Sequence, residues 1–157
     1  KGVQSKGVVP VVKHYAVNNS EFERLKSNSR VSERALREIY LKGFEIAVKE
    51  SNPGAIMSSY NHANDTKVCE NYTLITEIPR DEWNWDGCFM TDWWNDSAHI
   101  KELKAGHDIK MNFGYVDDVE EALNKGVLSR EQVASCAERV LRMILKIGRV
   151  QKLFSEE

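Results

Sequence analysis

The sequence lacks long apolar runs, a metal-type cysteine pattern and the features of a secreted precursor. None of its apolar runs is long enough to cross a bilayer. Residues 1–5 contain neither an apolar signal segment nor an initiator methionine, so we expect an interior or processed piece of a larger cytoplasmic protein. The three cysteines form an odd set without metal-ligand spacing, which predicts reduced thiols and neither a disulfide framework nor a metal site.

The charge pattern also excludes several classes of partner. The 22 lysines and arginines are scattered among 24 aspartates and glutamates, so the chain has no basic stripe for nucleic acid. No glycine-rich loop follows any predicted strand, which argues against a nucleotide cofactor. We therefore predict no cofactor, no nucleic acid and no membrane partner. The length and the hydrophobic fraction of 41% suit one globular domain with a sizeable core.

Short apolar segments alternate with stretches of helical periodicity. Apolar runs predict strands at 8–12, 55–57 and 88–90, and a weaker fourth strand at 107–111. Helices are predicted at 32–51, 72–82, 96–104, 116–124 and 129–148, with the polar stretches 17–31 and 62–71 as loops. About four strand–helix units with parallel strands imply an α/β fold. Two closures stay open, a doubly wound sheet or a partial (β/α)8 TIM-like barrel.

Polar side chains follow three of the predicted strands. Asp92 ends the third strand although aspartate is a poor strand former. It is either the N-cap of the next helix, which the stretch alone slightly favours, or a nucleophile or general base aimed into a pocket. Lys13-His14 and Tyr60-Asn61 follow two other strands. Because the carboxyl ends of parallel strands share one rim, three such clusters favour a site over a single helix cap.

These side chains suit a polyol ligand better than a phosphate. Lysine and histidine donate hydrogen bonds to hydroxyls, a tyrosine hydroxyl can orient a carboxylate, and an indole can stack on a sugar ring. Simpler explanations exist for each residue. Lys13-His14 can be a solvated strand end, and Tyr60 a core residue with its hydroxyl satisfied. Packing roles are expected for Trp83, Trp85 and Trp94, a turn role for Asp108, and a core position for Cys88.

Five spaced motifs resemble the N-terminal barrel domain of glycoside hydrolase family 3, the β-glucosidase-like enzymes. They lie at 12–19, 32–40, 57–61, 82–87 and 90–93. The resemblance covers residues 1 to about 115 in the order of the family and identifies the 157 residues as the second half of its barrel. It implies a retaining mechanism with a covalent intermediate, with Asp92 as the nucleophile.

The resemblance also implies which residues touch the sugar. The expected substrate-binding residues are Lys13, His14, Met57, Tyr60, Trp93 and Arg24. For Arg24 a sugar contact and a structural ion pair are equally open. Residues 15–19 lack the Pro-Gly-His-Gly-type loop of the β-N-acetylhexosaminidase branch, so a terminal β-linked glucose or xylose is the expected substrate. The turn Asn64-Asp65 and the segment 110–112 depart from the pattern of the family and put loop shape in doubt.

The resemblance implies a site that needs more than this chain. No acid/base residue can be assigned here, and the expected partners are the missing half-barrel and an acid/base-bearing domain of the same enzyme. A half-barrel also leaves open strand edges, so self-association is a further expectation. Two other readings stay open. One is a carbohydrate-binding or catalytically degenerate homologue, and the other is an unrelated flavodoxin-like α/β binding domain.

Overall fold

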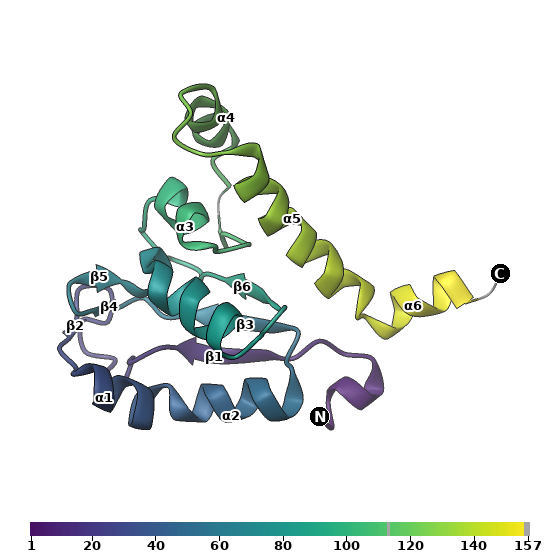
Figure 1. The fold of residues 1–157 in the computed structure, drawn as a ribbon, viewed down its shortest axis with the longest axis horizontal. Helices are drawn as coiled ribbons and strands as arrows, with labels where there is room; N and C mark the ends of the chain where they lie inside the picture. Colours follow the sequence, from purple (N-terminus) through teal and green to yellow (C-terminus); the bar gives the residue numbers. More distant parts are fainter. Residues whose placement is uncertain (113, 156–157) are drawn as a thin grey trace.

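The fold is built around a three-stranded parallel sheet. A computed structural model describes residues 1–112 and 114–155. The strands of the sheet, β1 (Val11–Tyr15), β3 (Ala55–Ser58) and β6 (Cys88–Met90), lie in the order β1–β3–β6 (Figure 1). The pairs Val12–Ile56 and Ile56–Phe89 set the register. The first strand starts at Val11 and not at the expected residue 8, because Pro10 has no N–H for a ladder. The predicted α/β class with parallel strands is confirmed.

Helices follow each strand of the main sheet before the next one begins, and one short helix precedes β1. They are η1 (Gln4–Lys6), α1 (Glu33–Ala35), η2 (Leu36–Tyr40), α2 (Lys42–Ser51), η3 (Val68–Glu70), η4 (Thr73–Glu82), α3 (His99–Ala105), α4 (Val116–Asn124), α5 (Arg130–Leu145) and α6 (Gly148–Ser155). The capping box of Ser129 and Gln132 starts α5, as predicted. Helix α5 runs alongside the β6 side of the sheet, and α6 extends from its end to the C-terminus (Figure 1).

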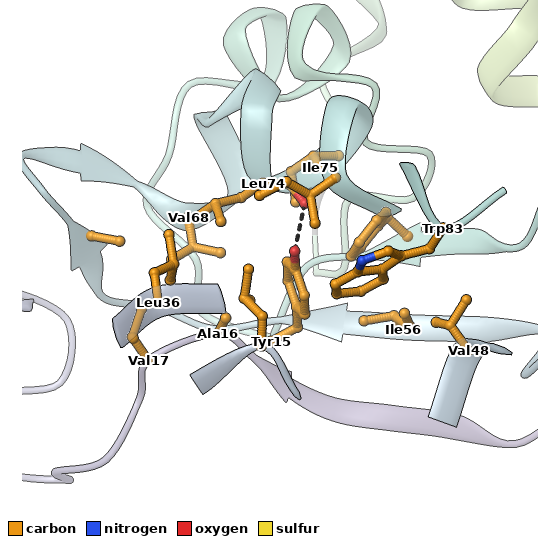
Figure 2. Packing of buried hydrophobic residues seen from close by; sticks show 14 of the residues in the cluster. Tyr15, Ala16, Val17, Leu36, Val48, Ile56, Val68, Leu74, Ile75 and Trp83 are labelled. Carbon is orange, nitrogen blue, oxygen red and sulfur yellow. Dashed lines mark hydrogen bonds between the residues drawn. The ribbon is translucent and has the colours of Figure 1, made fainter. Parts of the chain in front are cut away.

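The main core lies between the sheet and the helices that follow its strands. Tyr15 packs edge-on against Phe44, with ring centroids 4.9 Å apart. Its hydroxyl donates a 2.8 Å hydrogen bond to the carbonyl of Leu74 (Figure 2). Ile56 and Trp83 belong to the same cluster. Burying each such side chain contributes about 1.5–3 kcal/mol, so this core fixes the strands whose ends carry the polar residues.

A second, smaller sheet occupies segments that were expected to be loops. Strands β2 (Asn28–Ser29), β4 (His62–Ala63) and β5 (Thr66–Lys67) lie in the order β2–β4–β5, with β2 parallel and β5 antiparallel to β4. The β4–β5 turn uses Asn64 and Asp65, whose φ angles of 48° and 74° are those of a tight hairpin turn. The loop prediction was wrong here because strands of two residues leave no periodic signal.

Two further expectations differ from the structure in detail. The fourth strand is represented by a single parallel bridge between Met90 and Ile109. The ladder goes no further because the N–H of Met111 donates to the Thr91 hydroxyl instead. The third helix begins at His99 and not at residue 96. In the described ranges 1–112 and 114–155, none of the helices has the length and apolarity needed to cross a membrane.

Candidate active site

Asp92 lies just beyond β6, in the loop that leads to α3. The N–H of Trp93 donates a 2.8 Å hydrogen bond to Oδ1 of Asp92, and the carboxylate is largely buried. Helix α3 begins seven residues later with Ala98 as its N-cap. The helix-cap explanation of Asp92 is therefore wrong, and its second oxygen is available for another group.

That second oxygen faces His14, which comes from β1. His14 Nε2 lies 3.5 Å from Asp92 Oδ2, and the imidazole is about one-third exposed. At this distance a protonated imidazole forms an ion pair with the carboxylate. The carboxyl ends of β1 and β6 thus bring together two of the groups expected at the rim.

Tyr60 follows β3 and completes the cluster. Its hydroxyl accepts a 3.2 Å hydrogen bond from the Trp94 N–H. Burial raises the pKa of Tyr60 above its ordinary value, and the neighbouring Asp92 carboxylate raises it further, while the Trp94 N–H lowers it. The phenol therefore stays protonated at neutral pH and can donate a hydrogen bond to the carboxylate.

Arg24 joins the cluster from the loop between β1 and β2. Its guanidinium carbon lies 4.9 Å from the centroid of the Tyr60 ring, in cation–π range. The same guanidinium pairs with Glu21 at 2.8 Å. Of the two alternatives that the sequence left open, the ion pair is present, and the contact with a sugar stays a prediction.

The side chains of the remaining predicted residues form no hydrogen bond to Asp92 among the described contacts. Lys13 precedes His14 on β1 and is exposed, and Met57 of β3 is partly buried in register with Met90 of β6. Trp93 and Trp94 are 52% and 69% exposed. The packing role expected for Trp94 was therefore wrong, whereas the packing roles of Trp83 and Trp85 are confirmed.

Two polar residues hold β1 and β3 together at the rim. The sequence pointed to one of them, Asn61, beside Tyr60, but not to the other, Ser59. Ser59 donates from its N–H to the Tyr15 carbonyl at 2.6 Å and from its hydroxyl to the Ala16 carbonyl at 3.0 Å. The Asn61 amide lies 3.3 Å from the same Ala16 carbonyl. Their signal was the run of polar residues directly after an apolar strand. These bonds fix His14 and Tyr60 relative to each other.

A buried ion pair fixes the loop that follows Asp92. Lys110 Nζ lies 2.8 Å from Glu102 Oε1 and donates a 3.1 Å hydrogen bond to the Ser97 carbonyl. The Ser97 hydroxyl also donates to Glu102, and the Asn95 amide donates to Cys69 Sγ at 3.1 Å. Sequence reasoning missed this network because a lysine and a glutamate near a helix usually face solvent.

The assembled groups are of the kinds that bind sugar hydroxyls and attack an anomeric carbon. A carboxylate held by a backbone N–H can act as a nucleophile, and the imidazole, phenol and guanidinium can hydrogen-bond hydroxyls. Among the described residues, no group of three or more histidine, cysteine, aspartate or glutamate side chains could hold a metal ion. A polar site at the carboxyl ends of parallel strands is typical of α/β enzymes, both barrels and doubly wound sheets.

The chain belongs to glycosyl hydrolase family 3, because the family model of its N-terminal domain matches residues 1–143. Beta-glucosidase A of Butyrivibrio fibrisolvens is 47% identical over 133 residues, which cover 85% of this chain and 16% of that protein. The exo-alpha-(1->6)-L-arabinopyranosidase of Bifidobacterium longum is 41% identical over 147 residues, which cover 93% of this chain and 19% of that protein.

Solved structures show the same relationship. Beta-glucosidase 3B of Thermotoga neapolitana, in complex with glucose, is similar to this chain with a TM-score of 0.92 and 38% identity, over 97% of this chain and 23% of that one. The chain therefore spans about one-fifth of the length of these relatives. The predicted resemblance is confirmed.

Proposed function

We propose that the chain is the second half of a family-3 barrel and supplies the nucleophile, Asp92, of a retaining β-glycosidase. The convergence of Asp92, His14 and Tyr60 from three parallel strands is the observation that supports this best. The relatives named β-glucosidases support a terminal β-linked glucose as the sugar, with xylose as the alternative expected from the sequence.

In this mechanism the Asp92 oxygen forms a bond to the anomeric carbon as the glycosidic bond breaks. The leaving oxygen takes its proton from an acid outside this chain. Water then attacks the anomeric carbon and cleaves the glycosyl–Asp92 ester, and the two inversions at this carbon give net retention of its configuration. Lys13 and His14 bind sugar hydroxyls, Tyr60 orients Asp92, and Met57 and Trp93 wall the sugar. By itself the chain lacks the acid and is inactive.

The test is covalent trapping in the full-length protein. A 2-fluoro-glucoside slows the second step, so the intermediate accumulates and mass spectrometry of peptides locates it. We expect the label on Asp92 and none in the Asp92→Asn variant, whose turnover falls by about 10⁴-fold or more because the nucleophile is gone.

Asp86→Asn is the matched control. Asp86 lies in the same stretch but pairs with Lys146 on the surface, so labelling and turnover should be those of the wild type. A label on any other residue contradicts the assignment of Asp92. Sugar binding without any label would instead support a carbohydrate-binding homologue. The relative kcat/KM values for aryl β-glucoside, β-xyloside and α-L-arabinopyranoside substrates then show which sugar is preferred.

A further inference from the structure

Asp65, in the turn of the β4–β5 hairpin, has an unusual backbone conformation. Its φ of 74° lies in the left-handed region, which glycine adopts without cost and which other residues adopt less readily. Aspartate tolerates this region better than most residues, yet an interaction of its side chain is the expected compensation. The contacts of the turn show such an interaction.

Asp65 is bonded to the β2 segment in three ways. Its Oδ1 accepts a 2.8 Å hydrogen bond from the Asn28 amide, its N–H donates to Asn28 Oδ1 at 3.0 Å, and its Oδ2 forms an ion pair with Arg30. The preceding residue acts in the same way, because Asn64 accepts from the Val31 N–H at 3.0 Å and donates to the Val31 carbonyl at 2.9 Å. The turn therefore clamps residues 28–31.

The clamped segment leads directly to Arg24. Three residues separate Arg24 from β2, and the turn between them is closed by the 2.9 Å hydrogen bond from the Ser27 N–H to the Glu23 carbonyl. The Ser27 carbonyl accepts from the N–H of His62 in β4 at 2.8 Å. At the other end, the Arg24 guanidinium lies over the Tyr60 ring. One continuous series of contacts thus joins the hairpin turn to the rim.

We propose that Asp65 is a positioning residue, which holds Arg24 at the rim and thereby sets the affinity for the sugar. The proposal rests on the proposed function of the Asp92 site. Without the carboxylate, the Asn28 amide and the Arg30 guanidinium lose their partner, and the segment that carries Arg24 is held less firmly. The contacts of Asp92 with Trp93 and His14 do not involve this segment, and the Tyr60 hydroxyl keeps its hydrogen bond from the Trp94 N–H without Arg24. We therefore expect the chemical step to be retained.

Steady-state kinetics of the full-length protein on an aryl β-glucoside test this role. We expect Asp65→Gly to raise KM, and the inhibition constant of a non-hydrolysable thioglucoside, by about three- to tenfold, as loss of one or two exposed charge-assisted bonds implies. We expect kcat to stay within about twofold of the wild type. Glycine adopts the turn without strain, so folding is preserved.

Two further variants separate positioning from a general effect. Asp65→Asn can keep the bond to Asn28 but loses the charge that faces Arg30, so its KM should lie between those of Asp65→Gly and the wild type. Glu38→Gln removes an exposed ion pair with Arg34 on another element, and its KM should equal that of the wild type.

The outcomes distinguish the two proposals. Suppose that the protein turns over the substrate and is labelled on Asp92, but Asp65→Gly leaves KM and the inhibition constant unchanged. This result overturns the positioning role and leaves the proposed function standing. A fall of kcat with unchanged affinity overturns the positioning role as well, because Asp65 would then act on the chemical step. Absence of both turnover and thioglucoside binding in the wild type overturns the proposed function, and the positioning role with it.

Discussion

The two oxygens of Asp92 have different neighbours, and this difference orients the carboxylate before any substrate arrives. Oδ1 accepts the Trp93 N–H, while Oδ2 faces His14 at the rim. A nucleophile that is already oriented loses less freedom in the reaction, which is one source of catalytic rate. The contacts that fix Asp92 at the end of β6 therefore contribute to the proposed catalysis.

His107 illustrates at the same scale how burial makes a single residue sensitive to pH. Its imidazole is fully enclosed, with Nε2 2.9 Å from the Ser58 hydroxyl. Burial, together with the nearby positive charges of Arg80 and Lys110, lowers the pKa of His107 to about 3. Between about pH 6.5 and pH 3 the unfolded chain therefore binds a proton that the folded chain does not.

We predict that the stability of the protein falls as pH drops through this window, because protonation favours the unfolded state. The loss contributed by His107 is at most about 1.4 kcal/mol per pH unit. His107→Gln, which cannot take up the proton, should flatten this dependence in thermal unfolding between about pH 7 and pH 4. His62→Gln, at a partly exposed histidine, serves as the control, and equal flattening in both variants would contradict the prediction.

At the scale of secondary-structure elements, Asp108 joins three of them. Its carboxylate has no exposed surface and accepts from Arg80 of η4 at 2.9 Å, from Arg139 of α5 at 2.7 Å and from the Phe89 N–H of β6 at 2.7 Å. The turn role expected from the sequence was incomplete, because these partners lie far apart in the chain. Asp108 links helix α5 to the strand that precedes Asp92.

Asp108→Asn should destabilise the protein by about 3–5 kcal/mol, because two partly buried guanidinium groups lose their counter-charge. The fall in the thermal unfolding midpoint measures this cost. Glu138→Gln is the matched control on α5, since Glu138 pairs with Arg142 on the surface and its loss should cost about 0.5 kcal/mol or less. Similar unfolding midpoints for the two variants would contradict the predicted loss of about 3–5 kcal/mol in Asp108→Asn.

The elements were predictable to different degrees, for physical reasons. Helix α5 and the three main strands have long enough apolar patterns, or clear enough caps, to be read from local sequence. The β2–β4–β5 sheet and the Lys110–Glu102 pair depend on contacts between distant segments, which no local pattern encodes. The grouping of Asp92, His14 and Tyr60 could be anticipated because parallel strands place their carboxyl ends together.

At the scale of the whole molecule, apolar surface remains uncovered. The exposed side chains of Leu141, Leu145, Leu153 and Phe154 lie along α5 and α6. Strand β1 has one neighbour in the described sheet, and Val11 on it is partly exposed. Apolar helix faces and open strand edges favour association with another surface.

The 157 residues produced alone should therefore self-associate and should hydrolyse aryl β-glucosides poorly or not at all. Light scattering and a turnover assay measure the two properties. Leu145→Gln should reduce association, whereas Phe22→Gln, in a loop outside α5 and α6, should not. A stable monomer in solution would contradict the association, and normal turnover would contradict the dependence on an acid from another part of the enzyme.

The unequal exposure of the four tryptophans has an optical consequence. Trp93 and Trp94 are half or more exposed beside Asp92, whereas Trp83 and Trp85 are enclosed in the core. Indole fluorescence responds to its surroundings, so a soluble quencher reaches the first pair and spares the second. A sugar bound beside Asp92 would shield the exposed pair, while the enclosed pair provides an internal reference. The chain thus contains a natural probe with which occupancy of the rim can be followed without a label.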